Sequence, residues 1–224
     1  MEKFKKFALI VAGGSGNRMK NTVPKQFIPI NNKPILMHTL EVFHRYDPDM
    51  EIILVLPKNQ VKTWDEICRT NSFSVKHTIA FGGETRFHSV KNGLSKINNP
   101  GVVFIHDGVR PLVSPQTLSN CYQTASEKGN ALPVVPATES IRFIDGTKSK
   151  AVDRAKHFLV QTPQTFSVDQ IKKAYLQEFS EFFTDDASVL EKAGGHINTV
   201  EGNIENIKIT FPHDLQIASL LLQE

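Results

Sequence analysis

The apolar run Phe7-Ala8-Leu9-Ile10-Val11 leads directly into a glycine-rich segment, Ala12-Gly13-Gly14-Ser15-Gly16-Asn17-Arg18-Met19. An unbroken apolar run that ends in glycines is typical of a strand buried in a parallel sheet. The small residues let backbone N–H groups approach an anion, and Arg18 adds a permanent charge. The loop lacks the third glycine of the dinucleotide-binding fingerprint, where Met19 stands, and the Gly-Lys-Ser/Thr of a P-loop. It therefore predicts another kind of anion site, with a merely connecting glycine turn as the alternative.

The rest of the chain continues this alternation. Further apolar runs predict strands over Ile52–Leu56, Val75–Phe81, Val102–Ile105, Ala131–Val135, Ile197–Val200 and Ile207–Thr210. Between them apolar residues recur at helical spacing, and helix starts are indicated by Ser114-Pro115 and by a capping-box pattern at Ser167 and Gln170. Strands that alternate with helices predict one α/β domain over residues 1–224, with a mostly parallel, Rossmann-like sheet covered by helices on both faces.

Residues 137–157 interrupt the alternation. They are polar and β-leaning, and Asp145-Gly146 is typical of a hairpin turn. The apolar residues Ile141 and Phe143 are too few to form a core, and an isolated hairpin is marginal in water. We therefore expect this protruding β-arm to pack against a second copy of the chain and to make a homodimer.

The composition excludes several classes of protein. Of 224 residues, 40% are hydrophobic and 22% are charged, so the chain is neither low-complexity nor largely disordered. The formal net charge of +3 is too small to indicate a nucleic-acid-binding protein. No stretch approaches the ~18 uncharged apolar residues of a membrane span, and two cysteines do not make a disulfide framework. We expect a cytoplasmic protein with no membrane or nucleic-acid partner.

Polar clusters follow the predicted strands, at the end of the sheet where ligands bind in open α/β folds. In Val23-Pro24-Lys25-Gln26-Phe27, Pro24 restrains the backbone before Lys25, which makes this lysine a candidate phosphate contact, although a solvated surface lysine fits the same local sequence. The other clusters are Gly82-Gly83-Glu84-Thr85-Arg86-x-x-Ser89-Val90, His106-Asp107-x-x-Arg110-Pro111, Val152-Asp153-Arg154, Gln161-Thr162-Pro163-Gln164-x-Phe166, Thr184-Asp185-Asp186-Ala187-Ser188 and Asn206-Ile207-Lys208-Ile209-Thr210.

Taken together, and over nearly the whole chain, these motifs resemble the 2-C-methyl-D-erythritol 4-phosphate cytidylyltransferase family of the non-mevalonate isoprenoid pathway. The resemblance implies a nucleotidyltransferase fold, CTP and 2-C-methyl-D-erythritol 4-phosphate as substrates, and Mg²⁺ as cofactor. In such a reaction the acceptor phosphate attacks the α-phosphorus of CTP and pyrophosphate leaves. Because the acceptor is already an anion, the reaction needs cations placed beforehand rather than a protein nucleophile.

The resemblance also implies a role for each site residue. Arg18 and Lys25 would stabilise the transition state at the triphosphate, and Lys208 would position the acceptor phosphate together with Arg154 from the partner's arm. The residues expected to bind substrate are Ala12, Gly13, Gly14, Gly82, Glu84, Ser89, Asp107, Arg110, Ser140, Thr162 and Thr184. Asp107 would also be a weak Mg²⁺ ligand, since the metal stays mostly on substrate phosphates. Ser140 and Glu84 stand where the family usually has Thr and Asp, and keep the type of functional group.

Three alternatives remain open at this point. The related ribitol-5-phosphate cytidylyltransferases share the glycine loop and the Pro-Lys-Gln-Phe segment, although Val152-Asp153-Arg154 and residues 184–190 are closer to the erythritol enzymes. A CTP-binding module without turnover predicts missing cations, yet Arg18, Lys25 and Lys208 are present. An RNA-binding protein would need a basic run with exposed aromatic residues, which the sequence lacks. His106, at a strand end, is interpreted as a hydrogen-bonded structural residue rather than a general base.

Overall fold

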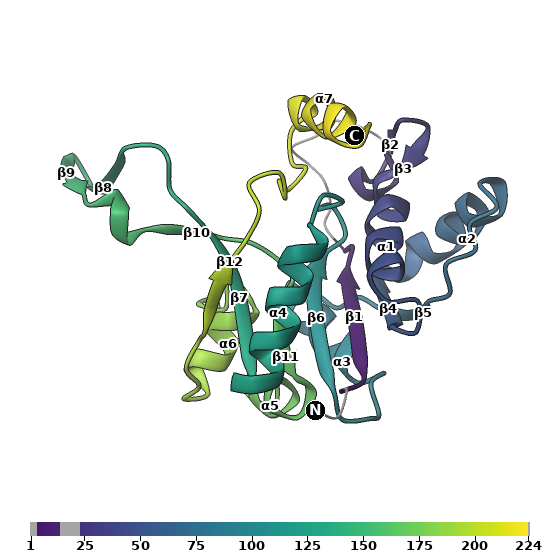
Figure 1. The fold of residues 1–224 in the computed structure, drawn as a ribbon, viewed down its shortest axis with the longest axis horizontal. Coiled ribbons are helices and arrows are strands. Elements are labelled where there is room, and N and C mark those ends of the chain that lie inside the picture. The colour runs from purple at the N-terminus through teal and green to yellow at the C-terminus, as the bar shows by residue number, and fades with distance from the viewer. Residues whose placement is uncertain (1–3, 14–22, 224) are drawn as a thin grey trace.

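The computed structural model describes residues 4–13 and 23–223, which form a twisted mixed sheet with helices on both faces (Figure 1). Within these residues the sheet has eight strands in the order β10-β7-β11-β6-β1-β4-β5, with β12 paired to β7. The strands are β1 (Lys6–Val11), β4 (Glu51–Leu56), β5 (Thr78–Phe81), β6 (Val102–Asp107), β7 (Asn130–Pro136), β10 (Phe158–Val160), β11 (Gln164–Ser167) and β12 (Thr199–Glu201).

Parallel pairing dominates the sheet, as predicted. β1 lies at its centre and pairs in parallel with β4 on one side and β6 on the other. Its last residue, Val11, is in register with both Val55 and Asp107, so the carboxyl ends of three strands lie at one level. β11 runs antiparallel to β6 and β7, and β10 runs antiparallel to β7. The loops that follow β1, β4 and β6 therefore meet at the same edge of the sheet.

Two layers of helices cover the sheet because the side chains of each strand alternate between its faces. Ala8 and Ile10 of β1 pack in one core with α1 (Ile35–Tyr46), α2 (Val61–Thr70) and α4 (Pro115–Lys128). Phe7 and Leu9 pack in the other core with α3 (Arg86–Leu94), α5 (Val168–Ala174) and α6 (Asp186–Lys192). The remaining elements are η2 (Lys25–Phe27), β2 (Pro29–Ile30), β3 (Lys33–Pro34), η3 (Lys58–Gln60) and α7 (Pro212–Leu221).

Helix starts follow the sequence signals in one case and not in another. The Ser114 side chain accepts a hydrogen bond from the Thr117 amide, with Pro115 in the first turn of α4, as predicted. The capping box predicted at Ser167 and Gln170 is wrong, because the Ser167 side chain makes no capping hydrogen bond. Ser167 is the last residue of β11 and pairs with Val102, so the strand runs directly into α5.

Some predicted strands differ in length or are absent. β5 begins at Thr78 rather than at Val75, and β12 covers Thr199–Glu201 rather than Ile197–Val200. The strand predicted over Ile207–Thr210 is wrong. The Ile209 amide donates to the Val109 carbonyl at 3.0 Å, but no ladder forms around this contact, and the buried Ile209 packs with α7. The segment instead brings Lys208 to the end of β6.

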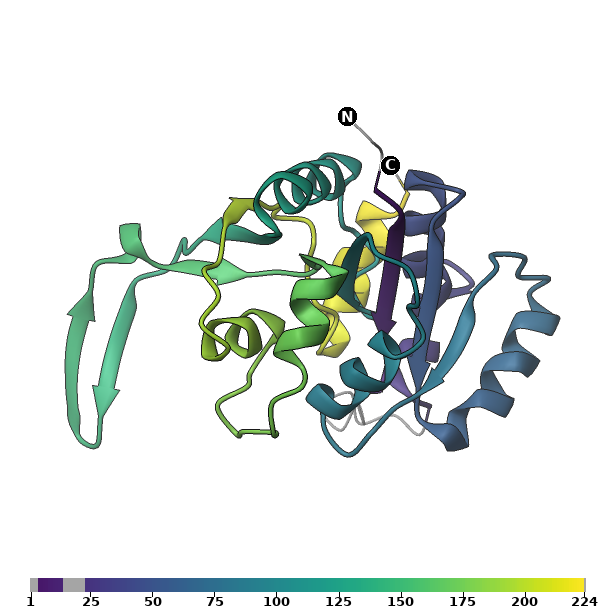
Figure 2. The ribbon, with the colours of Figure 1, turned by 90° about the horizontal axis from the view of Figure 1, so that it is seen from below.

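The predicted hairpin forms within residues 137–157. β8 (Ile141–Asp145) and β9 (Lys148–Val152) pair antiparallel around Gly146, which has a φ of 55°, and η4 (Arg154–Lys156) follows. This arm extends away from the main sheet in both views (Figures 1 and 2). Phe143 and Ile144 are 63% and 69% exposed. The arm has no core of its own, as its composition predicted.

No helix in residues 4–13 or 23–223 has the length and apolar character needed to cross a membrane.

Gly101 offers a test of the close packing at the amino end of β6. Its φ is +156°, and a Cβ at this position would clash with the Lys5 carbonyl oxygen, which accepts the amide hydrogen bond of Val102. Gly101→Ala should therefore lower the free energy of unfolding by about 3 kcal/mol, measured by urea denaturation at one protein concentration.

The matched control is Gly194→Ala. Gly194 also has a positive φ, +85°, but a Cβ there meets no heavy atom within 4 Å. The control should lose only the backbone strain of a left-handed alanine, about 1 kcal/mol. Equal losses in the two variants would show that the contact with Lys5 contributes nothing.

Candidate functional site

Two adjoining cavities lie at the carboxyl ends of the strands. The first has a volume of about 220 Å³ and is lined by Val11, Ala12, Gly13, Lys25, Gln26, Gly83, Glu84, Thr85, Arg86, Ser89, Asp107, Val109 and Lys208. The second has a volume of about 160 Å³ and is lined by Arg86, Asp107, Arg110, Val160, Gln161, Thr162, Gln164, Thr184, Asp185 and Lys208. Arg86, Asp107 and Lys208 line both cavities and therefore mark their junction.

The first cavity is bordered by backbone from the ends of β1 and β5. The Gly82 amide donates to the Leu56 carbonyl at 2.8 Å, and the Gly83 amide donates to Ser89 Oγ at 3.0 Å. A Cβ on Gly83 would clash with His88, so only glycine fits this approach of the loop to α3. Thr85 then caps α3 by accepting from the His88 amide. These contacts fix the loop that follows β5 against the start of α3.

Lys25 is held by its two buried neighbours. Gln26, 1% exposed, donates from Nε2 to the Ala12 carbonyl at 2.9 Å and to Gln60 Oε1 at 2.6 Å. The Phe27 ring stacks on Trp64, with 5.9 Å between ring centroids. The short helix η2 is thus anchored both to the end of β1 and to α2, which places Lys25 at the wall of the first cavity.

Asp107 is the buried anion at the junction of the two cavities. Its carboxylate lies 2.9 Å from Lys208 Nζ, 3.4 Å from Arg110 Nε and 4.0 Å from Arg86 Nε. Burial alone would raise the pKa of this carboxyl, but the Lys208, Arg86 and Arg110 charges outweigh it and hold the pKa well below its usual range. Asp107 is therefore ionised at neutral pH and cannot act there as a general acid.

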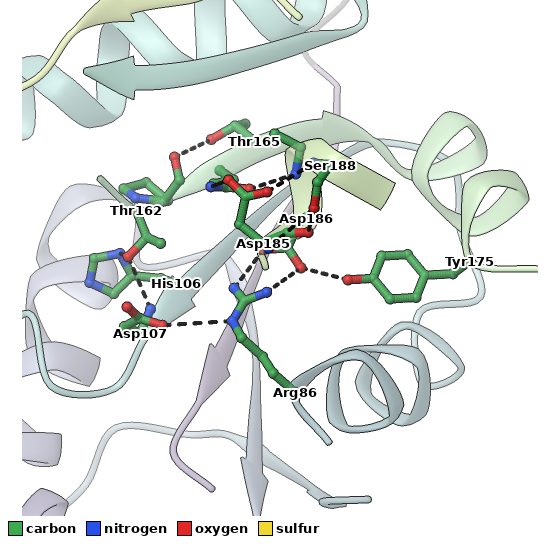
Figure 3. A network of polar contacts seen from close by, with 12 residues as sticks. Arg86, His106, Asp107, Thr162, Thr165, Tyr175, Asp185, Asp186 and Ser188 are labelled. Carbon is green, nitrogen blue, oxygen red and sulfur yellow. Dashed lines mark hydrogen bonds and ion pairs between the residues drawn. The ribbon is translucent and has the colours of Figure 1, made fainter. Parts of the chain in front are cut away.

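His106 is a structural residue in a closed hydrogen-bond network, as predicted (Figure 3). Its Nε2 donates to the Arg110 carbonyl at 2.9 Å, so Nδ1 is the acceptor and receives the Thr162 hydroxyl hydrogen at 3.1 Å. Thr162 Oγ1 in turn accepts from the Asp107 amide at 3.1 Å. Burial lowers the pKa of His106 to about 4, which keeps the ring neutral. This network fixes the Thr162 side chain in the wall of the second cavity.

The residues predicted from the sequence fall into four groups. Those that line the first cavity are Ala12, Gly13, Lys25, Glu84, Ser89, Asp107 and Lys208, and Gly82 adjoins it through Gly83. Those that line the second cavity are Asp107, Arg110, Thr162, Thr184 and Lys208. Ser140 and Arg154 lie in the arm and line neither cavity. Gly14 and Arg18 lie outside the described residues.

Several side chains at the site were missed by the sequence analysis. Arg86 lines both cavities and forms a forked ion pair with the buried Asp186, which also accepts from the Tyr175 hydroxyl. Arg86 and Asp186 both stand inside motifs that the sequence singled out, but they are 100 positions apart. Nothing in either motif indicates that the two side chains meet. Gln26, adjacent to Lys25, was missed because its partners, Ala12 after β1 and Gln60 of η3, are distant in the sequence.

The donor groups present do not form a metal cage. Among the residues that the structure describes, no group of three or more His, Cys, Asp or Glu could hold a metal ion. Asp107, the predicted weak ligand, already contacts Lys208, so a metal bound there would have to displace this lysine or share the carboxylate with it. The site residues thus do not fit a protein-held Mg²⁺ ion.

Comparison with known proteins yields one consistent family. The family model for 2-C-methyl-D-erythritol 4-phosphate cytidylyltransferase (IspD) matches residues 7–224. The Bacteroides fragilis protein of that name is 55% identical over 215 residues, which are 96% of this chain and 98% of the relative. The Bacteroides thetaiotaomicron protein of the same name is 52% identical over 218 residues, 97% and 100% of the two chains. The crystal structure of the Francisella tularensis protein of that name has a TM-score of 0.80 at 31% identity and covers 97% of this chain and 99% of its own.

The neutral His106 makes stability depend on pH in a defined window. The ordinary pKa of histidine is 6.5 and that of His106 in the folded chain is about 4, so between these values the unfolded chain binds the extra proton. The free energy of unfolding should therefore fall as the pH is lowered from 6.5 towards 4, by up to about 1.4 kcal/mol per pH unit from this group. Urea denaturation at several pH values would measure the slope.

The control is His106→Gln, whose amide can still donate to the Arg110 carbonyl but does not titrate. Its stability should depend less steeply on pH over the same window than that of the wild type. Identical slopes for the two proteins would mean that His106 takes up its proton equally in the folded and unfolded chains.

Proposed function

The chain belongs to the 2-C-methyl-D-erythritol 4-phosphate cytidylyltransferase family, and we propose that its two adjoining cavities hold the two substrates of that family's reaction. The enzyme transfers the cytidylyl group of CTP to 2-C-methyl-D-erythritol 4-phosphate, in the non-mevalonate route to isoprenoid precursors, and releases pyrophosphate. The observation that carries the assignment of the cavities is their shared wall of Arg86, Asp107 and Lys208, where the two phosphates would meet.

The first cavity is assigned to CTP. It is bordered by backbone at Ala12, Gly13 and Gly83, and backbone groups can read the donor and acceptor pattern of a base. Lys25 provides a cation for the triphosphate from the same wall. Ser89 Oγ is engaged by the Gly83 amide, so its hydroxyl hydrogen is free to donate to the nucleoside.

The second cavity is assigned to the acceptor. Its walls combine the cation of Arg110 with the hydroxyl groups of Thr162 and Thr184, which suit a phosphorylated polyol. Arg110 is held in place because its Nη1 also donates to the Asn206 carbonyl at 2.7 Å. The names of the 52–55% identical relatives favour erythritol phosphate over ribitol phosphate as the acceptor.

The chemical step needs no nucleophile from the protein. An oxygen of the acceptor phosphate attacks the α-phosphorus of CTP, a new P–O bond forms, and the bond to the bridging oxygen breaks as pyrophosphate leaves. Lys25 lines the first cavity and Lys208 lines both, so each lysine can approach this charge, and Arg18 would join them by family resemblance. Since Asp107 stays ionised, its part is to hold cations and to accept hydrogen bonds rather than to transfer a proton.

A divalent cation is expected to arrive with the nucleotide. The described residues offer no cage for Mg²⁺, and this ion is commonly held through substrate phosphates. When bound there it would neutralise charge on the triphosphate. The requirement for Mg²⁺ stays a prediction, as does the cytoplasmic location.

The arm is proposed to complete the site of a partner subunit. Arg154 donates to the Thr138 carbonyl at the base of the arm and lines neither cavity of its own chain. Phe158 and Leu159 of β10, next to the arm, are 52% and 59% exposed. Such apolar side chains favour burial against a second copy of the chain. A two-fold dimer would cover them and carry Arg154 towards the other subunit's second cavity.

The reaction is tested by incubating the enzyme with CTP, a divalent metal and either erythritol or ribitol phosphate. We expect pyrophosphate release with 2-C-methyl-D-erythritol 4-phosphate, and loss of turnover when EDTA removes the metal. Pyrophosphate release with ribitol 5-phosphate alone would contradict the assignment of the acceptor, and turnover that resists EDTA would contradict the metal requirement.

The role of Lys25 is tested with the same assay. Lys25→Ala should lower turnover by about 100-fold or more at saturating CTP.

The arm is tested by mixing Arg154→Ala chains with Lys25→Ala chains. Hybrid dimers would contain one site with both wild-type residues, so random mixing should restore activity to about a quarter of the sites. The matched control replaces Arg154→Ala with Arg142→Ala, because Arg142 lies in the same arm but is bound to Ser149 within the hairpin. Arg142→Ala should be active without mixing. Hybrid dimers without recovery would place Arg154 in its own chain's site.

A further inference from the structure

Arg86, at the start of α3, is held by an ion pair with Asp186, at the start of α6 (Figure 3). Its Nη1 and Nη2 donate to the two carboxylate oxygens of Asp186 at 2.8 and 2.6 Å, which is a bidentate fork. Asp186 Oδ1 also accepts from the Tyr175 hydroxyl at 2.6 Å. The Asp186 side chain is fully buried, whereas Arg86 keeps 29% of its side chain exposed. The guanidinium is therefore fixed from behind and open on its other side.

The supports of Asp186 are themselves fixed. Asp185 caps α6 in a reciprocal capping box with Ser188. Gln164 of β11 donates to Asp185 Oδ2 and accepts from the Ala187 amide, both at 2.8 Å. The start of α6 is thus tied to the sheet on both sides of Asp186. Such a frame determines where the carboxylate lies, and through it the plane of the Arg86 guanidinium.

Stability alone does not account for this arrangement. A buried ion pair contributes little more to folding than well-packed apolar residues of the same volume. Arg86 is also the first residue of α3, where the helix dipole disfavours a positive charge, and the first turn of α3 contains no acidic residue. Residues that break a local rule in this way are concentrated at functional sites.

The position of Arg86 indicates what it contacts. It lines both cavities, and the residues beside it in the second one include Thr184 and Asp185, which belong to the same segment as its partner Asp186. Its Nε is 4.0 Å from Asp107, beyond hydrogen-bond distance. Asp186 takes one N–H from each of two nitrogens, so the guanidinium keeps further donors for a ligand.

We propose that Arg86 binds the phosphate of the acceptor where the two cavities meet, and that Asp186 and Tyr175 are positioning residues that set the orientation of its guanidinium. The inference rests on the proposed function, because it takes the second cavity as the acceptor's. A planar fork recognises phosphate oxygens with a fixed direction, which a flexible lysine such as Lys208 does not provide. Arg86 thereby holds the attacking oxygen towards the nucleotide.

The test uses Tyr175→Phe and Arg86→Lys in the full-length enzyme. Tyr175→Phe removes only the hydroxyl and keeps the ring, which stacks on Phe87 with 4.7 Å between centroids. Arg86→Lys keeps the charge opposite Asp186 and loses the fork. The control is Tyr122→Phe, because the Tyr122 hydroxyl donates to the Phe4 carbonyl at the other end of the sheet. Melting temperatures show whether each variant is folded.

The expected result is a separation of the two substrates. The KM for the acceptor should rise about 3- to 10-fold in Tyr175→Phe and more in Arg86→Lys, while CTP affinity by calorimetry stays within about 2-fold of the wild type. Tyr122→Phe should leave both unchanged. Acceptor binding is also measured by calorimetry with a non-hydrolysable CTP analogue, so the inference is judged even if turnover is absent.

Two results would overturn the inference. A lowered melting temperature of Tyr175→Phe with an unchanged acceptor KM would make the Tyr175–Asp186–Arg86 contacts purely structural. Weaker CTP binding with an unchanged acceptor KM would assign Arg86 to the nucleotide. A different outcome separates the inference from the proposed function. If Arg86→Lys weakens acceptor binding by calorimetry but the wild type releases no pyrophosphate, the inference holds and the proposed function is contradicted.

Discussion

The buried carboxylate of Asp107 at the end of β6 is the charge on which the arrangement of the site depends. A single ionised carboxylate would be costly to remove from water, so its burial requires compensating cations. These are Arg110, which follows Asp107 by three residues, and Lys208 and Arg86, which come from two distant segments of the chain. The ion pairs of Lys208 and Arg86 tie their two segments to the end of β6. Without the carboxylate, the three cations would repel one another across the same small volume.

The sheet brings these segments together for a simple geometric reason. β1 is buried on both faces and pairs in parallel with β4 and β6, so the loops after all three strands leave from one edge. The tight contact between Gly83 and α3 and the anchoring of Gln26 then bring two loops close to that edge. Parallel pairing thus determines where a site can form, and local contacts determine its shape.

The apolar runs and glycine motifs of the sequence predicted the sheet and its helices, because these features depend on local patterns. The family resemblance supplied half of the residues that line the two cavities. The strand over Ile207–Thr210 was wrong because an alternating pattern shows which side chains are buried, not whether a neighbouring strand is available. The contact of Arg86 with Asp186 could not be predicted, since it depends on how α3 and α6 pack on the same face of the sheet. The proposed placement of Arg154 in a partner subunit likewise involves a second chain, which no local pattern of this sequence describes.

The site contains two kinds of cation, and the difference suits phosphoryl transfer. Lys208 is 42% exposed and contacts Asp107 through one point charge, so it can turn towards a substrate phosphate while remaining near its carboxylate. Arg86 is fixed by a bidentate fork to a fully buried carboxylate and cannot reorient without breaking it. In the proposed reaction, the fixed cation would direct the attacking phosphate oxygen, and the adaptable cation would follow the negative charge as it moves to the leaving pyrophosphate. Because catalysis of this kind relies on charges placed before the reaction, the proposed function needs the buried anions Asp107 and Asp186 as much as the cations that they hold in place.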